Sequence, residues 1–334
     1  MLALHSQHPM LRLFRAGLPR LLGLVTPLAL GACQGADSPL APDDTSPPAT
    51  AVSAAPDHIL AAGTGQWIVF ASFRNSFQPD IYKTDPLGNT VVPLTPSFSD
   101  YDAAPAVSYD NQRIAMVRRR MAGNPLSDDI YVINADGGNG HWVRPTQYPF
   151  QLADPSWSPD GTRIVLTVLL NGGTYLATMD VASGQVSLVS PAGIRGEDPS
   201  YDPTGQKIIY VSHDLRSIQQ VNADGTGQKV RFSSATPIGH PTFSPNGKKI
   251  AFHRIVSSTY PDIFVKNLVD GSVKRLTSAV ASDIHPTWSP DGSRIAFASL
   301  RSGKYQIYTV SAAGGIATRI TNTGTDERSP AWSH

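Results

Sequence analysis

Large apolar residues alternate with small or polar ones along short stretches of this chain, and the alternation restarts at intervals of 42 to 50 residues. Successive side chains of a β-strand point to opposite faces, so a period of two predicts strands. Ile250-Ala251-Phe252 and Ile295-Ala296-Phe297 are clear examples. The equivalent segments begin at one isoleucine in each unit, namely Ile68, Ile114, Ile164, Ile208, Ile250 and Ile295.

A phrase that starts with proline recurs in register with these strands. It reads PSWSPDGTRI from Pro155, PSYDPTGQKI from Pro199, PTFSPNGKKI from Pro241 and PTWSPDGSRI from Pro286, with a weaker copy, PAVSYDNQRI, from Pro105 and a short one, PAWS, from Pro330. The six prolines lie 50, 44, 42, 45 and 44 residues apart. Repeats of this length are typical of propellers and solenoids.

Two further strands are expected in each unit. The third strands begin near Ile81, Ile130, Leu176, Ile218, Ile263 and Ile307, and the fourth strands end near Thr95, Thr146, Ser190, Ser233, Thr277 and Thr321. Asp160-Gly161 is expected to join a first to a second strand and Asp224-Gly225 a third to a fourth, because glycine supplies the positive φ that such turns need. Four short antiparallel strands form one propeller blade.

The series of prolines and the series of second strands are offset along the chain. The first predicted strand, near Trp67, is a second strand, whereas the last, Pro330 to Ser333, is a first strand. We therefore expect blade one to take its first strand from the C-terminal segment and the other three from residues 66–95, which leaves neither edge unpaired. The predicted fold is all-β: a six-bladed β-propeller of four-stranded antiparallel blades over residues 63–334, closed by the C-terminal strand.

Residues 1–32 are expected to form a signal peptide. Arginines precede the largely apolar run Leu21 to Leu30, which is ten residues long, whereas a membrane-spanning helix needs about 20. The run ends in Leu30-Gly31-Ala32-Cys33, which resembles the lipobox of bacterial lipoproteins. This resemblance implies cleavage before Cys33 and lipid attachment to Cys33. The alternative is a conventional secretory signal in which the cysteine is incidental.

The composition of the chain agrees with export and limits its partners. Cys33 is the only cysteine, so no disulfide can form within the chain. Residues 33–62 are rich in Ala, Ser and Pro and predict a disordered tether. Gln34, in place of an aspartate, favours the outer membrane if the organism is Gram-negative. Without the three leader arginines, 24 basic residues stand against 26 acidic ones, so no nucleic-acid partner is expected.

The repeated phrase PxWSPDGxxIAF, followed by IYxx and a terminal LT, resembles the TolB-like propeller family. The resemblance covers roughly residues 65–334 and implies six blades. The best-known member of the family also carries an α/β domain before its propeller, which residues 33–62 are too short and too polar to form.

The residue before each proline recurs once per blade, and equivalent residues of a propeller form a ring about its axis. The six residues are Ala104, Asp154, Asp198, His240, His285 and Ser329. In TolB-like propellers this stretch, by resemblance, leads into the innermost strand near the channel mouth. We therefore expect a candidate channel and ligand-binding site at Asp154, Asp198, His240 and His285.

The same four side chains are the best cation site that the sequence offers. Two carboxylates and two imidazoles suit a divalent transition metal, and propeller-type oligogalacturonate lyases, by resemblance, hold a metal with histidines on such an axis. The alternative is that these residues hydrogen-bond loop backbone or line a hydrated channel. No cofactor is expected, although a divalent metal in the channel stays open.

Other recurrent residues favour structural roles. Trp157, Tyr201, Phe243, Trp288 and Trp332 share one repeat position, which suits either a sugar platform or packing between blades, and packing is the expectation. The basic run Arg118 to Arg120 is expected at the end of a second strand, leading into a solvated loop, with an acidic partner or lipid headgroups as the alternative. The sequence contains no GxSxG, HExxH, GxxxxGK(S/T) or CxxC motif.

We therefore expect a non-catalytic cell-envelope lipoprotein that binds a protein or cell-wall material. Its expected partner is an envelope protein or a peptidoglycan-associated one, its contact with the membrane is through the N-terminal lipid, and the monomer is favoured. Two alternatives stay open: a metal-dependent, glycan-active enzyme similar to oligogalacturonate lyases, and a small-molecule or sugar sensor that uses the central channel.

Overall fold

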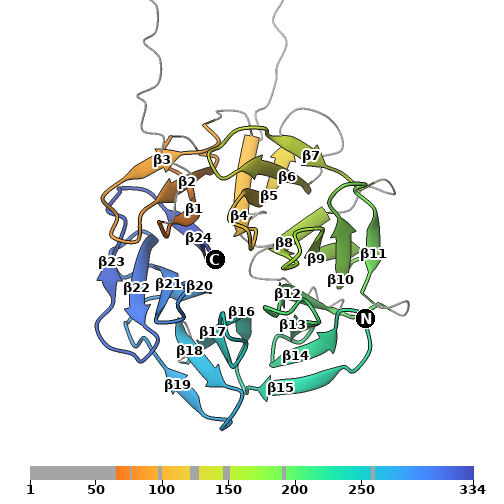
Figure 1. Cartoon of the computed structure of the whole chain (residues 1–334). Helices are drawn as coiled ribbons and strands as arrows, with labels where there is room; N and C mark the ends of the chain where they lie inside the picture. The colour runs from red at the N-terminus through yellow and green to blue at the C-terminus, as the bar shows by residue number, and fades with distance from the viewer. Residues whose placement is uncertain are drawn as a thin grey trace, which may run out of the picture. The chain divides into compact units, whose positions relative to one another are not determined.

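Six four-stranded antiparallel sheets surround a central axis in the computed structural model of the protein (Figure 1). The structure describes residues 65–75, 77–96, 100–120, 128–145, 151–189, 193–256 and 260–334. The predicted signal peptide, Cys33 and the predicted tether lie outside the described residues. Among the described residues, no helix is long and apolar enough to cross a membrane.

Each sheet is one blade, and strands are counted outward from the axis. The prediction of an all-β, six-bladed propeller of four-stranded blades is confirmed. Blade one contains β24 (Glu327–Trp332), β1 (Ile68–Ser72), β2 (Asp80–Thr84) and β3 (Val91–Pro93); blade two, β4 (Asp100–Val107), β5 (Arg113–Arg120), β6 (Asp128–Asn134) and β7 (His141–Val143); blade three, β8 (Gln151–Trp157), β9 (Arg163–Leu170), β10 (Gly173–Asp180) and β11 (Val186–Leu188). Blade four contains β12 (Gly196–Tyr201), β13 (Lys207–Ser212), β14 (Ser217–Asn222) and β15 (Lys229–Ser233); blade five, β16 (Ile238–Phe243), β17 (Lys249–Ile255), β18 (Pro261–Asn267) and β19 (Val273–Arg275); blade six, β20 (Asp283–Trp288), β21 (Arg294–Ser299), β22 (Gln306–Ser311) and β23 (Thr318–Arg319).

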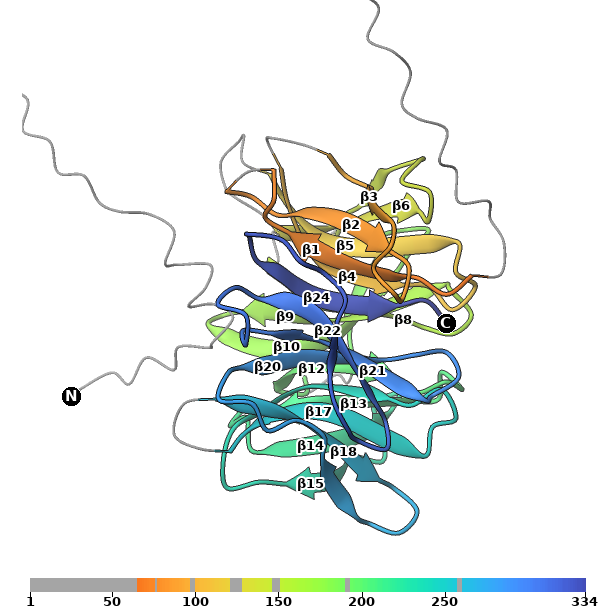
Figure 2. The same cartoon turned by 90° about the vertical axis from the view of Figure 1, so that its left-hand side faces the viewer.

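The ring closes through the two strands that are farthest apart in the sequence. Strand β24 lies beside β1, with Ile68 opposite Trp332 and Val69 opposite Ala331 (Figure 2). The amide of Ser333 donates to the carbonyl oxygen of Trp67 at 2.9 Å, which extends the pairing beyond the strands. The prediction that blade one takes its first strand from the C-terminal segment is confirmed.

The core consists of the faces that neighbouring blades press together. Ile68 and Phe70 of blade one share a buried cluster with Ala296 and Ile307 of blade six. The recurrent aromatics of the first strands belong to these interfaces and are each 9% exposed or less: Trp157, Tyr201, Phe243, Trp288 and Trp332. The indole of Trp157 also donates to the carbonyl oxygen of Ala106 in blade two, at 3.1 Å. The five recurrent aromatic side chains therefore pack neighbouring blades against each other, as expected.

The repeated turn phrase has a hydrogen-bonding reason. In blade three, the hydroxyl of Ser158 donates to Asp160 at 2.6 Å and accepts from the amide of Arg163 at 3.0 Å. Gly161 follows with a φ of 66°, the left-handed conformation predicted for it. Ser108, Ser244 and Ser289 form the same turn in other blades.

The terminal LT of several repeats caps a strand instead of continuing one. Strand β3 ends at Pro93, two residues before the predicted end near Thr95. The hydroxyl of Thr95 accepts from the amide of Ile81 at 2.9 Å, and Thr277 and Thr321 bond to their third strands in the same way. In blades one, five and six the first amide of the third strand is thus satisfied by a side chain.

The basic run lies at the end of a second strand, as predicted, but its two described side chains are paired with acids and not solvated. Arg118 and Arg119 lie within β5. Arg118 donates twice to buried Asp102, at 2.5 and 2.6 Å, and Arg119 donates twice to Asp128, at 2.6 and 2.7 Å. These side chains neutralise acids on neighbouring strands, so they do not offer free positive charge to a partner.

Ring closure can be tested by deleting Ser329–His334. The deletion removes Trp332, which is 3% exposed, and leaves an edge of β1 unpaired. Loss of a buried Trp side chain alone costs about 3–5 kcal/mol, so we expect the Tm to fall by at least about 10 °C in a thermal melt followed by circular dichroism. As a control, Ile316→Ala alters a side chain that is 94% exposed and should leave Tm nearly unchanged. An unchanged Tm in the deletion variant would show that the closing strand does not hold the ring.

Candidate functional site

A β-bulge interrupts the innermost strand of every blade at the residue before the proline and the proline itself. In blade three, Ala153 pairs with Thr167 and Ser156 with Val165, so Asp154 and Pro155 face one residue of β9. Proline cannot donate to a sheet, and bulges are among the places where a strand tolerates it. The same shift occurs in the other five blades.

The six residues that precede these prolines share an unusual backbone conformation. Their φ angles lie between 48° and 55°, in the left-handed region: Ala104, Asp154, Asp198, His240, His285 and Ser329. Such a conformation costs a residue other than glycine about 1–3 kcal/mol and persists where the surrounding structure enforces it. Because it recurs in all six blades, it is a property of the repeat, and it carries one side chain per blade toward the axis.

These residues line a central cavity of about 350 Å³. Its walls are the bulges and the residues that follow them in β4, β8, β12, β16, β20 and β24, which surround the axis in Figure 1. Toward one end the lining includes Tyr109, Pro245 and His334. A cavity of this size is in the range of sites for small ligands or a short stretch of peptide.

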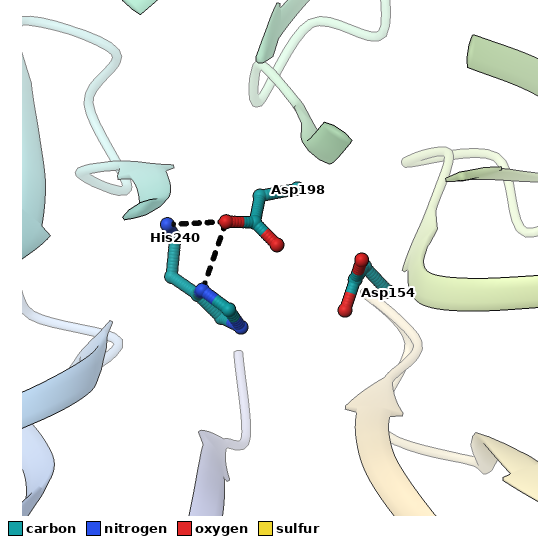
Figure 3. A group of neighbouring side chains, drawn as sticks. All are labelled: Asp154, Asp198 and His240. Carbon is teal, nitrogen blue, oxygen red and sulfur yellow. Dashed lines mark hydrogen bonds and ion pairs between the residues drawn. The ribbon is translucent and has the colours of Figure 1, made fainter. Parts of the chain in front are cut away.

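Three of the four predicted site residues converge from three consecutive blades. Asp154, Asp198 and His240 place one possible ligand atom each within 4.8 Å of one another (Figure 3). The fourth, His285 of blade six, stacks on His240 with ring centroids 4.0 Å apart. The structure therefore brings together the residues that the repeat register selected; that they bind a ligand stays a prediction.

Asp198 holds His240 at two points. One carboxylate oxygen, Oδ2, accepts from the backbone amide of His240 at 2.8 Å and lies 2.9 Å from its Nδ1. Burial lowers the pKa of His240, but attraction to Asp198, with smaller contributions from Asp154 and Glu197, outweighs it and raises that pKa to about 9. The charged imidazole therefore forms a close ion pair with Asp198, and the amide hydrogen bond keeps that carboxylate beside the ring.

The two neighbouring imidazoles are in the opposite state. Burial, followed by the positive charge of His240, lowers the pKa of His285 well below its ordinary value and that of His253 to about 3. Nδ1 of His285 lies 3.1 Å from the hydroxyl of Ser329. The site thus combines one charged imidazole with two neutral ones.

Sequence reasoning missed His253, because it lies on the second strand, β17, and not in the proline phrase. Its ring centroid is 5.5 Å from that of His240. His253 stands opposite Gly239, where an added Cβ would approach the imidazole to 2.5 Å. A glycine where other blades carry a side chain was the available signal that an imidazole fills the space beside it.

Blades one, two and six carry a second feature that the sequence analysis did not recognise. Three residues before the proline they have a fully buried acid, paired with an arginine of the second strand or of the loop after it, which in turn lies over a tyrosine of the third strand. The sets are Glu327, Arg74 and Tyr82; Asp102, Arg118 and Tyr131; and Asp283, Arg301 and Tyr308. Blades three to five have Leu152, Gly196 and Ile238 at that position. The described ring is therefore polarised, with ion pairs on one side and the Asp and His site centred on the other.

Fold and channel together define a six-bladed propeller whose inner bulges present polar side chains to the axis. Comparison with known families agrees: the model described as TolB beta propeller domain matches residues 61–254 and 217–334. The chain belongs to the TolB β-propeller family.

Similar proteins include a Protein TolB homolog of Chlorobium luteolum, 34% identical over 150 residues, which are 44% of this chain and 33% of that protein. The Tol-Pal system protein TolB of Francisella tularensis is 33% identical over 81 residues, 24% of this chain and 18% of that protein. The chain thus matches about a third or less of the length of these curated relatives.

Solved structures show the same fold at low sequence identity. TolB from Acinetobacter baumannii superposes with a TM-score of 0.69 at 22% identity, over 80% of this chain and 66% of that one. An oligogalacturonate lyase in complex with manganese superposes with a TM-score of 0.53 at 15% identity, over 78% of this chain and 74% of that one. At these identities the likeness concerns the fold alone.

Substitutions at Ala104 test whether the bulge enforces the left-handed conformation. We expect Ala104→Val to lower the free energy of unfolding by about 1–3 kcal/mol, because a branched side chain tolerates positive φ poorly, and Ala104→Gly to leave it unchanged or raise it. Urea denaturation measures both. Ala106, two residues on and paired with Ala115 in regular register, is the matched control: Ala106→Gly should destabilise. If glycine changed the free energy of unfolding equally at the two positions, the left-handed backbone at position 104 would not be strained.

Proposed function

We propose that this protein is an exported, lipid-anchored and non-catalytic propeller of the bacterial cell envelope that binds a segment of a partner protein in its central channel. The observation that carries the proposal is the polar site at the axis, where Asp154, Asp198 and His240 converge beside a cavity of about 350 Å³. The partner is an envelope protein or a peptidoglycan-associated one.

The cavity favours an extended segment over a folded domain. Its volume accommodates a few residues of peptide, whereas a folded partner would contact the blade faces. The acids Asp154 and Asp198 and the imidazoles of His240 and His285 can donate to and accept from peptide groups. The six blades form one closed ring, so the segment would bind to a rigid, preorganised surface and lose less free energy to ordering of the site.

Anchoring is proposed from the sequence of the N-terminal segment. Residues 1–32 would be the signal peptide, Cys33 the lipidated residue and residues 33–62 the tether, all outside the described residues. The family supports an envelope role, because a similar protein in Francisella is named as part of the Tol-Pal system. Gln34 favours the outer membrane if the organism is Gram-negative.

Lipid anchoring is tested by Cys33→Ser. Loss of the thiol removes the site of acylation, so the variant should move from the membrane fraction to the soluble fraction and lose incorporation of labelled palmitate. Cell fractionation and labelling of the parent and variant measure this. Substitution of the neighbouring Gln34 by Asn is the control and should keep the label. A Cys33→Ser protein that stays fully membrane-bound would contradict lipid anchoring.

Channel binding is tested by photo-crosslinking in intact cells. A crosslinking amino acid at Pro245, an exposed residue of the channel lining, should capture a discrete partner, whereas the same amino acid at Val280, which is 92% exposed and outside the lining, should not. Mass spectrometry identifies the captured protein. Adding Asp154→Arg, which fills the channel, should reduce capture from Pro245 at least about tenfold, a change of about 1.4 kcal/mol. Equal capture from both positions, or capture that Asp154→Arg leaves unchanged, would contradict binding in the channel.

A further inference from the structure

We propose that the guanidinium of Arg254 in blade five binds a carboxylate of a partner protein, at a surface separate from the channel. The inference goes beyond the proposed function, because Arg254 is not part of the channel lining. It rests on a comparison of blades two and five. The two blades share an arrangement of charged and aromatic side chains, but blade five lacks the acid that neutralises the arginine in blade two.

In blade two, an arginine of the second strand is surrounded by an acid on each side and an aromatic ring. Arg118 stands opposite Asp102 of the first strand and opposite Asp129 of the third strand. Its guanidinium lies over the ring of Tyr131, 3.8 Å from the ring centroid. Asp102 accepts two hydrogen bonds from Arg118, at 2.5 and 2.6 Å, so the positive charge is neutralised within the blade.

Blade five has the same arrangement with one member changed. Arg254 stands opposite Asp262 of the third strand, and its guanidinium lies over the ring of Phe264, 4.1 Å from the ring centroid. On the first strand, however, the residue opposite Arg254 is Ile238. The position that holds Asp102 in blade two therefore holds an apolar side chain in blade five.

Arg254 consequently lacks the neutralising contact that Arg118 has. Among the described residues, no acid lies within 4.0 Å of its guanidinium nitrogens. Asp262, which stands opposite it, is bound instead to Arg275, with 2.6 Å between oxygen and nitrogen. Burial, and then the positive charge of Arg275, lower the pKa of Arg254. An outside carboxylate would provide the attraction that Asp102 provides in blade two.

The guanidinium of Arg254 is held in place and can still be reached from solvent. The ring of Phe264 and that of Phe232, from the neighbouring blade four, lie 4.1 and 5.9 Å from its central carbon (Figure 1). None of its nitrogen atoms is buried without a partner, so these nitrogens contact solvent. A guanidinium oriented on aromatic rings presents a planar pair of donors, which matches the two oxygens of a carboxylate.

The site lies far from the end of the channel that contains Pro245. That residue belongs to the turn between β16 and β17, and β17 starts at Lys249. Arg254 is the next-to-last residue of β17, about 17 Å further along the strand at a rise of about 3.3 Å per residue. A partner at Arg254 would therefore contact the face of the propeller away from the Pro245 turn.

The neighbouring side chains favour a protein partner over a phosphate-bearing surface. Val256 follows Arg254 by two residues, the spacing of side chains on one face of a strand, and is 39% exposed. Its amide donates to the carbonyl oxygen of Tyr260 at 3.3 Å, and Tyr260 is 38% exposed. One unneutralised cation beside exposed apolar side chains suits one aspartate or glutamate in an apolar segment, whereas lipid phosphates are bound by clusters of several cations.

The site is tested by photo-crosslinking in intact cells that produce the full chain. A crosslinking amino acid at Val256 should capture a discrete protein, and mass spectrometry should place an aspartate or glutamate close to the crosslinked residue of that protein. Arg254→Met removes the charge and should reduce capture at least about tenfold, because truncation of a charge pair at an interface is costly. The matched control is Arg195→Met. Arg195 is an exposed arginine over the ring of Tyr175 and should not affect capture.

A second variant restores the missing acid within the chain. The carboxylate of Ile238→Asp should bind Arg254 as Asp102 binds Arg118, which should also reduce capture from Val256 at least about tenfold. Ile238 is 3% exposed, so the variant buries a charge and should lower Tm in thermal melts followed by circular dichroism. The fall in Tm should be smaller with Arg254 present than in an Arg254→Met background, because only Arg254 can neutralise the new carboxylate.

Four outcomes would overturn the proposal. The first is that Val256 captures no protein, or captures lipid instead. The second is that Arg254→Met leaves capture unchanged, and the third is that Arg195→Met reduces capture as much as Arg254→Met does. The fourth is that Ile238→Asp lowers Tm equally in both backgrounds, since the carboxylate site of blade two would then have no equivalent in blade five.

Crosslinking from Pro245 separates this proposal from the proposed function. If Pro245 captures a partner and Val256 captures none, the Arg254 site is wrong and binding in the channel stands. If capture from Val256 depends on Arg254 and Pro245 captures nothing, the Arg254 site stands and binding in the channel is wrong.

Discussion

The pairing of β24 with β1 is the interaction on which the rest of this structure depends. It joins residues more than 250 positions apart, Ile68 with Trp332, and turns a row of blades into a closed ring. Closure gives the inner edge of β1 a partner and completes the fourth strand of blade one, so that the edges left are the short ones of separate blades. Only then do the six bulges face one another across a channel, so that His240 of blade five and Asp154 of blade three belong to one site.

Within that ring, the backbone around each bulge is the same from blade to blade, whereas the side chains at the axis differ. The bulge, its proline and the left-handed residue before it recur in every blade, and the serine or aspartate that orders the following turn recurs in blades two to six. The chemistry at the axis does not recur. Alanine and serine stand at positions 104 and 329, while acids and imidazoles stand at the other four. A uniform backbone therefore supports a one-sided site, which is how repeat architectures acquire function without altering their fold.

The two sides of the propeller differ in where their buried acids lie. On the side of blades six, one and two, buried acids are each neutralised by an arginine, as Glu327 is by Arg74 at 3.1 Å. Those carboxylates link the first strand of each blade to the second strand or to the loop that follows it. In blades three and four an acid stands at the position before the proline, where Asp154 and Asp198 face the cavity. Asp198 is paired there with the imidazole of His240, whose Nδ1 lies 2.9 Å from Oδ2 of Asp198.

The sequence by itself determined the number of blades, their four strands, the closing strand and the ring of residues before the prolines, because all of these follow from local periodicity, turn chemistry and a steady register. The tertiary structure decided what no local pattern encodes. It showed that Arg118 is bound to Asp102 within a sheet, that an acid, an arginine and a tyrosine are grouped in blades one, two and six, and that His253 lies beside His240, opposite Gly239. Each of these depends on distances between segments far apart in the chain, which are set by packing and by closure of the ring.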